Sequence, residues 1–563
     1  MLERAVENWL AKATERSFQV PFCHMLANEG YTVVHMSRHD PMEFGKDVLA
    51  IDADGTPCAF QLKGGNLTLS KWRTEVRDQV GDLVELAIEH PSIDPSVPHR
   101  SFFVTNGKID EKAAHVIDAY NKKLASRGYP KLETWAGGEL VGKAKALQTN
   151  LWPSELTDAK TLLELYLHDG RDVFPKAKLA SLLEATLPFE KTADGESQPK
   201  TVCNRAIASA AVLTALVLSS FTERQNHVAE IEAWTMYVAY TLGLAERWAL
   251  EPKHYEAEVK IALQAIKNKL TDLAQEIAER RGIAEGLVSA DEPFREIRRH
   301  WLAGLLCVLV LWRKTENEDP DGLERSIAHF ANESLKRLYL WGEAQLPQLL
   351  AAYWYQRLVN ARPGEADRLL GLLVRQVCVA SNPSRQEVLA DVYTEAGEWL
   401  PHVADQQLEE LLGDDTLRGY RLAKQPPEAA WKGYSHVLEG LVHLLVQQNW
   451  KEMVKGLWPD VTRTNWHSFE FDEPWHFYRW RNETGAQKVV IPMRTQRWEE
   501  LKTSADDSSG AELPVLIRQR PIFALLFLFV YPHRTSAALL RWLNVELKQA
   551  IRHATSGPDS RIG

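Results

Sequence analysis

The most informative stretch of the chain spans residues 47–63 and reads DVLAIDADGTPCAFQLK. Residues 47–51 and 58–63 are runs of mostly apolar and β-branched side chains of strand length. Residues 52–57 between them are rich in Asp, Gly and Pro, the residue types that form tight turns. The stretch therefore predicts an antiparallel β-hairpin that carries a carboxylate, an amide and an amine.

The length of the hairpin turn decides whether these polar side chains can meet. Gln61 and Lys63 are two residues apart, so they share a face of their strand. A two-residue loop at 54–55 would place Asp47 opposite Leu62, on the other face of the sheet. The residue types of the turn do not by themselves select this register or its alternative.

A three-residue loop at 53–55, with Gly55 supplying a positive φ, would place Asp47 opposite Gln61. This register also sets apolar residues opposite each other on the reverse face: Val48 with Phe60 and Ala50 with Cys58. An apolar reverse face suits a core, and it leaves Asp47, Gln61 and Lys63 together at a cleft. We therefore expect the three-residue loop.

Short β-rich runs alternate with amphipathic helices up to about residue 150. Further strands are expected at 31–36, 101–105 and 132–135. Helices are expected at about 2–14, 18–28, 72–87 and 110–125. The second of these helices would have Ser17 as its N-cap and Pro21 in its first turn. The order αβββαβαβ predicts an α/β domain over residues 1–150, built on a mixed sheet.

Helical periodicity continues almost unbroken over residues 151–563, which predicts a large all-α region. Its helix pairs are of roughly solenoid size, although no repeat signature is present. Three apolar runs, 206–221, 301–312 and 521–531, contain polar residues or fall short of the about 20 residues that span a bilayer. We expect buried helices there, and no membrane insertion.

Charge and cysteine content narrow the class of protein. The net charge is −10 and the pI is near 6.0, so nucleic-acid binding would need a local basic patch or metal ions in a cleft. The five cysteines are scattered, with no C-x-x-C pair, which favours reduced thiols over a zinc site. The N-terminus is acidic where a signal peptide needs basic residues, so a cytoplasmic location is expected.

The polar side chains of the hairpin suit phosphodiester chemistry. The Asp47 carboxylate, the Gln61 side-chain oxygen and the Leu62 carbonyl offer hard oxygen ligands to Mg²⁺, and Mn²⁺ would fit the same set. The metal would stabilise charge on a scissile phosphate and lower the pKa of an attacking water. Lys63 would orient that water or neutralise the developing charge. This set favours hydrolysis without a covalent intermediate.

Asp47 followed by Gln-Leu-Lys at 61–63 resembles the D…(E/Q)xK signature of the restriction-endonuclease-like superfamily. Its Mrr-type branch has Gln-x-Lys, a first helix ending in Gly-Tyr, here residues 30–31, and a later strand ending in Val-Thr-x-Gly, here residues 104–107. The resemblance covers roughly residues 15–150. It implies an αβββαβ core, a Mg²⁺-dependent endonuclease activity on DNA, and a bacterial restriction or antiphage-defence role.

The sequence departs from that family at one position of the first helix. The family usually has Glu eleven residues before the Gly of Gly-Tyr, and here that position is Gln19. Glu15, about one turn earlier, is the candidate substitute. The implied catalytic set is Asp47, Gln61, Lys63, Gln19 and Glu15. Because one acid is missing, the alternative is a catalytically lapsed nuclease fold that binds nucleic acid or serves as a protein-interaction scaffold.

Basic residues near the hairpin are candidates for DNA binding. Lys71, Arg73 and Arg77 begin the next helix, where they could contact phosphates, and a merely solvated helix face is an equal alternative. Gln79 could reach the cleft, but packing at the edge of the core is favoured. The densely aromatic residues 466–480 favour aromatic packing over base stacking, because acidic residues interrupt them.

DNA is the expected substrate, and RNA stays open because the metal and the lysine would act on either backbone. The helical residues 151–563 are expected to recognise a partner protein or a trigger, or to mediate self-association. Nothing in the residues identifies that trigger.

Overall fold

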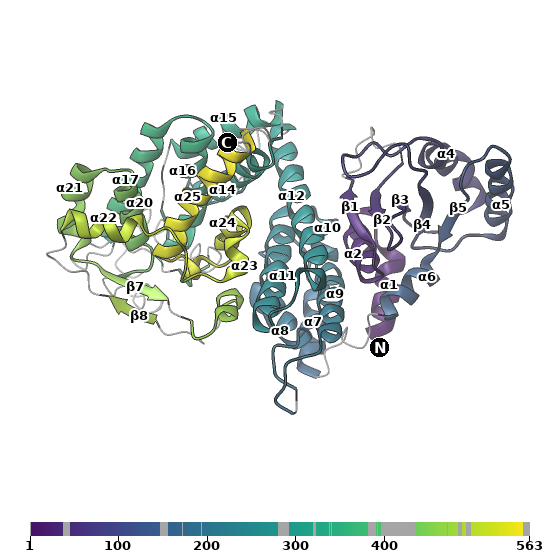
Figure 1. The fold of residues 1–563 in the computed structure, drawn as a ribbon, viewed down its shortest axis with the longest axis horizontal. Coiled ribbons are helices and arrows are strands. Elements are labelled where there is room, and N and C mark those ends of the chain that lie inside the picture. The colour runs from purple at the N-terminus through teal and green to yellow at the C-terminus, as the bar shows by residue number, and fades with distance from the viewer. Residues whose placement is uncertain are drawn as a thin grey trace, which may run out of the picture. The chain divides into compact units, whose positions relative to one another are not determined.

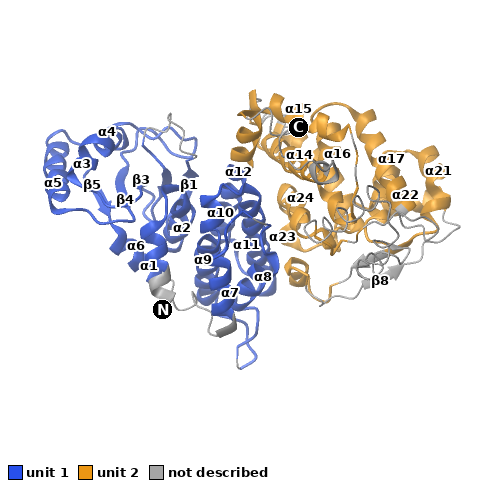
Figure 2. Ribbon diagram, turned by 180° about the vertical axis from the view of Figure 1, so that it is seen from behind, with its two compact units in different colours: residues 1–269 blue, residues 270–563 orange. Residues whose placement is uncertain are grey.

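A computed structural model gives the fold of the chain (Figure 1). It describes residues 2–555 except 38–44, 147–155, 172, 193, 280–291, 319–321, 337, 339, 381–389, 391, 396–433, 470, 482–486 and 491–496. The chain divides into two compact units, residues 1–269 and 270–563, which Figure 2 shows in different colours. Each unit has its own core, and each is described by itself below.

The first unit contains a five-stranded mixed sheet. Its strands are β1 (Thr32–Met36), β2 (Val48–Ile51), β3 (Pro57–Lys63), β4 (Arg100–Thr105) and β5 (Leu132–Trp135). They lie side by side in the sheet in the same order as in the sequence. β1, β2 and β3 pair antiparallel, and β3, β4 and β5 pair parallel. The expected mixed sheet is confirmed. All five predicted strand positions are occupied by strands.

Helices surround this sheet. They are α1 (Leu2–Lys12), α2 (Glu15–Asn28), α3 (Leu69–Lys71), the π-helix η2 (Trp72–Val76), α4 (Arg77–Glu85), α5 (Glu111–Ser126) and α6 (Gly137–Ala146). Phe22 of α2 packs edge-on against Phe60 of β3, with ring centroids 5.5 Å apart. The neighbouring Ala59 belongs instead to the core formed with η2, α4 and α5. The alternating residues of β3 therefore face two different helical layers.

Helix α2 begins earlier than the sequence predicts. Its N-cap is Thr14, whose side chain accepts from the backbone N–H of Ser17 at 3.3 Å. The predicted N-cap at Ser17 is therefore wrong, and Pro21 lies inside the helix instead of in its first turn. The consequence is functional, because Glu15 becomes the first helical residue, one turn before Gln19 on the same side of α2.

Helices complete the first unit. They are α7 (Leu156–Tyr166), α8 (Lys176–Thr186), α9 (Lys200–Val217), α10 (Ser219–Glu223), α11 (His227–Arg247), the 3₁₀-helix η4 (Pro252–His254) and α12 (Glu256–Glu279), which begins in this unit. The change from sheet to helices falls near residue 150, as expected. The compact unit nevertheless continues to residue 269, so the sheet shares its unit with α7 to α11.

Helix α2 joins the sheet to these helices. Its buried His24 contacts the Glu258 carboxylate of α12 and stacks on Trp234 of α11, with ring centroids 5.7 Å apart. The expectation of an interior histidine is confirmed. One face of α2 thus meets the strands, and another meets the helical layer.

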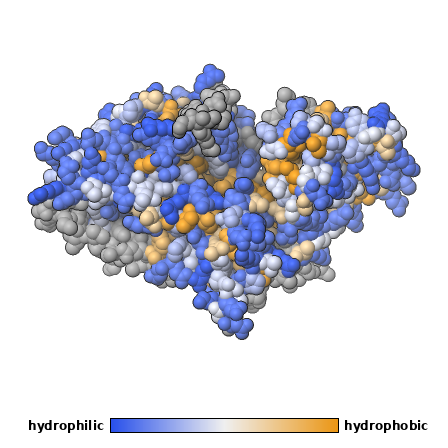
Figure 3. Space-filling model, viewed as in Figure 1, coloured by the Kyte–Doolittle hydropathy of each residue, from blue (hydrophilic) through white to orange (hydrophobic). Residues whose placement is uncertain are grey.

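Apolar residues of the first unit are mostly internal. Among the described residues one helix, α9, is long and apolar enough to cross a membrane, and 72% of it is buried inside the fold, as in a core helix. Over the whole chain, polar residues dominate the face drawn in Figure 3. The large apolar side chains that are exposed in the described part of the chain are Leu86, Val97, Tyr129, Leu163, Leu167, Val173, Leu372 and Val515.

The second unit is mainly helical. Its helices are α14 (Glu292–Thr315), α15 (Gly322–Leu335), η5 (Glu343–Gln345), α16 (Leu346–Leu358), α17 (Pro363–Ala380), α20 (Leu438–Gln447), α21 (Lys451–Val461), η7 (Pro474–Tyr478), α22 (Trp498–Asp506), α23 (Val515–Arg518), α24 (Pro521–Val530), η8 (Pro532–Arg534) and α25 (Ala537–Thr555). A small sheet accompanies them, made of β6 (Tyr434–Ser435), β7 (Asn465–Phe469) and β8 (Gln487–Val490). The prediction of an all-α region is therefore wrong in this detail.

The aromatic stretch at 466–480 explains the error. It begins in β7, where helical periodicity was expected to continue, and ends in η7. Phe477 is 2% exposed and stacks on Phe527 of α24, with ring centroids 5.1 Å apart. Aromatic packing is confirmed for the described part of this stretch, because the rings lie inside the unit and base stacking would need them exposed.

Candidate active site

The register of the hairpin is the one expected from a three-residue loop. Val48 pairs with Phe60, and Ala50 pairs with Cys58. Asp47 lies just before β2, and its N–H donates to the Phe60 carbonyl at 2.9 Å. The paired residues end at Val48 and Phe60, and beyond them the Asp47 carboxylate accepts from the N–H of Leu62, the neighbour of Gln61. The three-residue loop, with Gly55 at φ +84, is confirmed.

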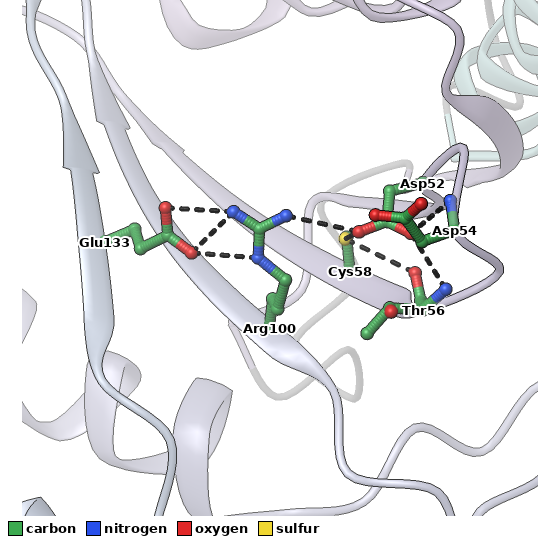
Figure 4. Close-up of polar contacts among 6 residues, drawn as sticks. All are labelled: Asp52, Asp54, Thr56, Cys58, Arg100 and Glu133. Atoms are coloured by element: carbon green, nitrogen blue, oxygen red, sulfur yellow. Dashed lines mark hydrogen bonds and ion pairs between the residues drawn. The ribbon is translucent and has the colours of Figure 1, made fainter.

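A charged network at the turn end holds this register (Figure 4). Asp52 Oδ1 accepts from the backbone N–H groups of Thr56 at 2.8 Å and Asp54 at 3.1 Å. Arg100 on β4 bridges the carboxylates of Asp52 at 3.1 Å and Glu133 on β5 at 2.8 Å. The backbone N–H of Thr56 is the main cause that lowers the pKa of Asp52. Four neighbouring strands are tied together by this network.

The other end of the hairpin carries the predicted metal ligands. Asp47 and Gln61 are buried, with 9% and 1% of their surface exposed. Asp47 Oδ2 accepts from the backbone N–H of Leu62 at 2.6 Å, and Gln61 Nε2 donates to the side-chain oxygen of Gln79 at 2.7 Å. Gln61 Oε1 is buried, and no group in the described part of the chain donates to it. A buried amide oxygen without a donor is costly, so it is a natural place for a ligand.

Lys63 and Glu15 meet at the end of β3. The Lys63 ammonium lies 3.4 Å from Glu15 Oε2, and both side chains are partly exposed. The backbone N–H of Gly64, next to this lysine, donates to Glu15 Oε1 at 3.3 Å. The carboxylate of the first turn of α2 therefore binds both the lysine and the backbone that follows it. The structure thus brings two of the predicted site residues, Glu15 and Lys63, into contact.

Gln19 occupies a different role from an acid. Its Nε2 donates to the backbone carbonyls of Ser37 and Asp47, each at 3.0 Å. A carboxylate could not donate these two hydrogen bonds. Gln19 therefore ties the end of β1 to the backbone of Asp47, and its amide nitrogen contacts the protein chain.

The three predicted DNA-binding residues have different surroundings. Lys71 Nζ donates to the carbonyl of Gly64 at 2.7 Å, so this lysine lies beside the Lys63 motif. Arg73 and Arg77 are exposed. Arg77 and Gln79 are two residues apart on α4 and so point about 200° apart. Since Gln79 faces Gln61, Arg77 points away from the site.

The Val-Thr-Asn-Gly segment after β4 supports the loop that follows Lys63. Asn106 Oδ1 accepts from Gly65 N at 2.6 Å, and its Nδ2 donates to the Leu10 carbonyl at 2.6 Å. Thr105 Oγ1 donates to the Gly65 carbonyl at 2.6 Å. A Cβ on Gly107 would lie 2.3 Å from Gly65 C, so only glycine fits there. In the sequence this segment only resembled a family motif, and the contacts give a physical reason for its residues.

Two residues near the site were not among the site residues predicted from the sequence. Gln79, which sequence reasoning assigned to the edge of the core, contacts Gln61 directly. Lys46, the neighbour of Asp47, is 7% exposed and donates to the Asp82 carbonyl at 3.3 Å. Burial lowers the pKa of Lys46. Neither residue belongs to a motif, and only the approach of α4 to β2 and β3 reveals them.

The donor set fits a hard cation. Asp47 supplies a carboxylate and Gln61 an unpaired amide oxygen, and the carbonyl of the buried Leu62 was expected to add a third oxygen. The described residues hold no group of three or more His, Cys, Asp or Glu side chains suited to a metal. A site with one carboxylate, neutral oxygens and water resembles what Mg²⁺ accepts, and it lacks the nitrogen and sulfur ligands of zinc.

Comparisons with models of protein families, with curated proteins and with solved structures found no match to this chain.

Proposed function

We propose that this chain is a metal-dependent nuclease that hydrolyses phosphodiester bonds in DNA, in the manner of the Mrr-type enzymes that residues 15–150 resemble. The observation that supports this most is that Gln61, two residues before Lys63, has a buried oxygen without a donor among the described residues, while the Asp47 carboxylate accepts from the N–H of the adjacent Leu62. A bacterial restriction or antiphage role follows from the same resemblance.

The proposed chemistry divides among four side chains. Asp47 and Gln61 would hold Mg²⁺ or Mn²⁺, which would polarise the scissile phosphate and lower the pKa of the attacking water. Lys63 holds its ammonium at the edge of the site, where it stabilises negative charge on the phosphate. Glu15 contacts that ammonium at 3.4 Å and fixes its direction. Gln19 holds the backbone of Asp47 in place.

Helix α2 provides a route for regulation by the helical layer. Glu15 and Gln19 on this helix contact the site, and His24 on the same helix contacts Glu258 of α12. A partner or trigger that shifts α12 would act on α2 directly, because the buried pair couples the two helices. This arrangement supports the proposal that the helical region controls cleavage.

The direct test is cleavage of duplex DNA with Mg²⁺ by the full chain and by the variants Lys63→Ala and Asp47→Ala. We expect both variants to lose at least about 100-fold in rate. Lys122→Ala, an exposed lysine on α5, is the matched control and should cut normally. Equal cutting by all four proteins would remove the assignment. A parallel assay with single-stranded RNA decides between the two backbones.

A second candidate function is nucleic-acid binding without cleavage. The observation in its favour is that Gln19, at the position of the family acid, uses its amide to bind backbone carbonyls. This candidate predicts DNA binding with a steep salt dependence, no product with any divalent metal, and no response to Lys63→Ala.

A further inference from the structure

We propose that Gln79 is a positioning residue that orients the carboxamide of Gln61, so that the oxygen of Gln61 and not its nitrogen faces the metal. This inference rests on the proposed function and deepens it. Gln79 belongs to α4 and not to the hairpin, so it would be a separate part of the site. Its role is to select which end of an amide is presented.

The first observation is the hydrogen bond between the two amides. Gln61 Nε2 donates to Gln79 Oε1 at 2.7 Å, and Gln61 is only 1% exposed. An amide group has a donor end and an acceptor end of nearly the same shape, so sterics alone cannot decide which end points where. An acceptor at Gln79 binds the nitrogen end. The oxygen end is then left without a donor among the described residues.

The second observation is the close packing around the nitrogen end of Gln61. Gly45, two residues before Asp47, has φ +72, and a Cβ there would lie 2.7 Å from the Gln79 carbonyl oxygen and 3.6 Å from Gln61 Nε2. The backbone that leads into Asp47 therefore lies against the main chain of Gln79 and beside the amide nitrogen of Gln61. A side chain at position 45 would clash with the Gln79 carbonyl and disturb this packing.

The direction of Gln79 depends on the π-helix that precedes it. The N–H of Arg77 donates to the carbonyl of Trp72, five residues earlier, where an α-helix would use a residue four earlier. One additional residue in a turn rotates all later side chains by about 100° about the helix axis. Without η2, the Gln79 side chain would be rotated by about 100° from the direction in which it meets Gln61. π-helical turns occur often at functional sites, which agrees with a positioning role.

The proposal predicts different effects for side chains that accept and side chains that donate hydrogen bonds at position 79. Gln79→Glu keeps an oxygen for Gln61 Nε2 and should preserve the orientation of the amide. Gln79→Lys offers only donors, so it should attract Gln61 Oε1 and turn the nitrogen toward the metal. Gln79→Met has a similar length and no polar group, and it should give an intermediate result.

The readout is the affinity for Mn²⁺, measured on the full chain by electron paramagnetic resonance without DNA. We expect Gln79→Lys to weaken Mn²⁺ binding by about 10- to 100-fold, as losses of outer-shell partners do, and Gln79→Glu to leave it unchanged or tighter. The Mg²⁺ concentration for half-maximal cleavage should shift in the same order. Circular dichroism confirms that each variant is folded.

A second background separates orientation from simple charge repulsion. A carboxylate has two equivalent oxygens and no nitrogen end, so in the Gln61→Glu background Gln79→Lys should no longer weaken Mn²⁺ binding by more than about 2-fold. Repulsion between the lysine and the cation would persist in that background. An equal loss in both backgrounds, or equal affinities for Gln79→Lys and Gln79→Glu, would overturn the positioning role.

These outcomes also distinguish the two proposals. If the unmodified chain binds Mn²⁺ and cuts DNA but the position-79 variants do not differ, the nuclease stands and the role of Gln79 is wrong. If the unmodified chain binds no Mn²⁺, both are wrong.

Discussion

The two ends of the β2–β3 hairpin differ in whether their polar side chains all have hydrogen-bond partners. At the turn end, Arg100 pairs with two carboxylates, and Asp52 also accepts two backbone N–H groups. At the other end, Asp47 and Gln61 are more deeply buried than Arg100, and the Gln61 oxygen has no donor among the described residues. The same two strands thus carry one satisfied network and one incomplete one.

This difference indicates separate tasks for the two ends. A network in which every charged group has hydrogen-bond partners fixes geometry, and here it fixes the register of the strands. A buried acceptor that lacks a donor costs free energy in the empty protein, and binding a cation or a donor would recover it. The turn end should therefore control stability, and the other end should control activity. Three of the four predictions that follow test this division, the one at Gly107 tests the loop after Lys63, and they begin with the largest effect.

Asp47→Asn should reduce the rate of DNA cleavage by at least about 100-fold, because the site loses its only buried carboxylate for the metal. The free energy of unfolding should change by less than about 1 kcal/mol, because the Asn oxygen still accepts from Leu62 N–H. Cleavage assays and urea denaturation measure the two effects. Asp54→Asn, an exposed residue of the turn, should change neither. A variant that keeps its rate but unfolds easily would reverse the assignment of tasks.

Gly107→Ala should destabilise the first unit by about 3 kcal/mol, or abolish folding, because the added Cβ meets backbone atoms of the loop after Lys63. Denaturation followed by circular dichroism gives the value. Gly142→Ala, in α6 with nothing within 4 Å of its Cβ, is the control and should stabilise by up to about 1 kcal/mol. Similar effects at both glycines would show that the loop does not need this close approach.

Arg100→Met should lower the free energy of unfolding by about 1 kcal/mol, since the pair is partly exposed and its Coulomb attraction is screened. The affinity for Mn²⁺ should stay the same, because the change is at the turn end. Arg127→Met removes a more exposed ion pair and should change stability by less than about 0.5 kcal/mol. Loss of Mn²⁺ binding in Arg100→Met would show that the two ends of the hairpin depend on each other.

Asp52→Asn should produce the smallest effect, and only as a function of pH. The folded state lowers the pKa of Asp52, mainly through the backbone N–H of Thr56. The unfolded state therefore takes up the proton first, and the stabilising contribution is present above about pH 4 and is lost as the pH falls through the lower folded pKa. The unfolding temperature of the unmodified chain should fall more steeply between pH 5 and pH 2.5 than that of Asp52→Asn. If the unfolding temperatures of both proteins fall equally with pH, the Asp52 carboxylate makes no such contribution to stability.

Local sequence patterns predicted the hairpin and its register correctly. The apolar pairs on the reverse face and the glycine at φ +84 both depend on residues close together in the chain. The start of α2 was predicted three residues too late, because Thr14 and Ser17 are both good N-caps and only the folded chain shows which one is used. β7 was missed because an aromatic run carries no clear period.

Contacts between distant residues could not be predicted in this way. Gln79 lies 18 positions from Gln61, and Lys63 lies 48 positions from Glu15. Whether such pairs meet depends on how α2 and α4 pack on the sheet, and packing is decided by the shapes of many side chains at once. The sequence raised Gln79 as a residue that could reach the cleft but favoured packing at the edge of the core, because local spacing does not show which way α4 turns its side chains toward the sheet.

The sequence alone determined the alternation of strands and helices up to residue 150, the turn of the hairpin, and the set of Asp47, Gln61 and Lys63, because each of these depends on spacing along a single strand or turn. Only the tertiary structure decided that Glu15 reaches Lys63, that Gln19 binds backbone, and that the Gln61 oxygen is left without a donor. The physical reason is that a buried hydrogen bond is a relation between elements, and it exists only after the elements have packed.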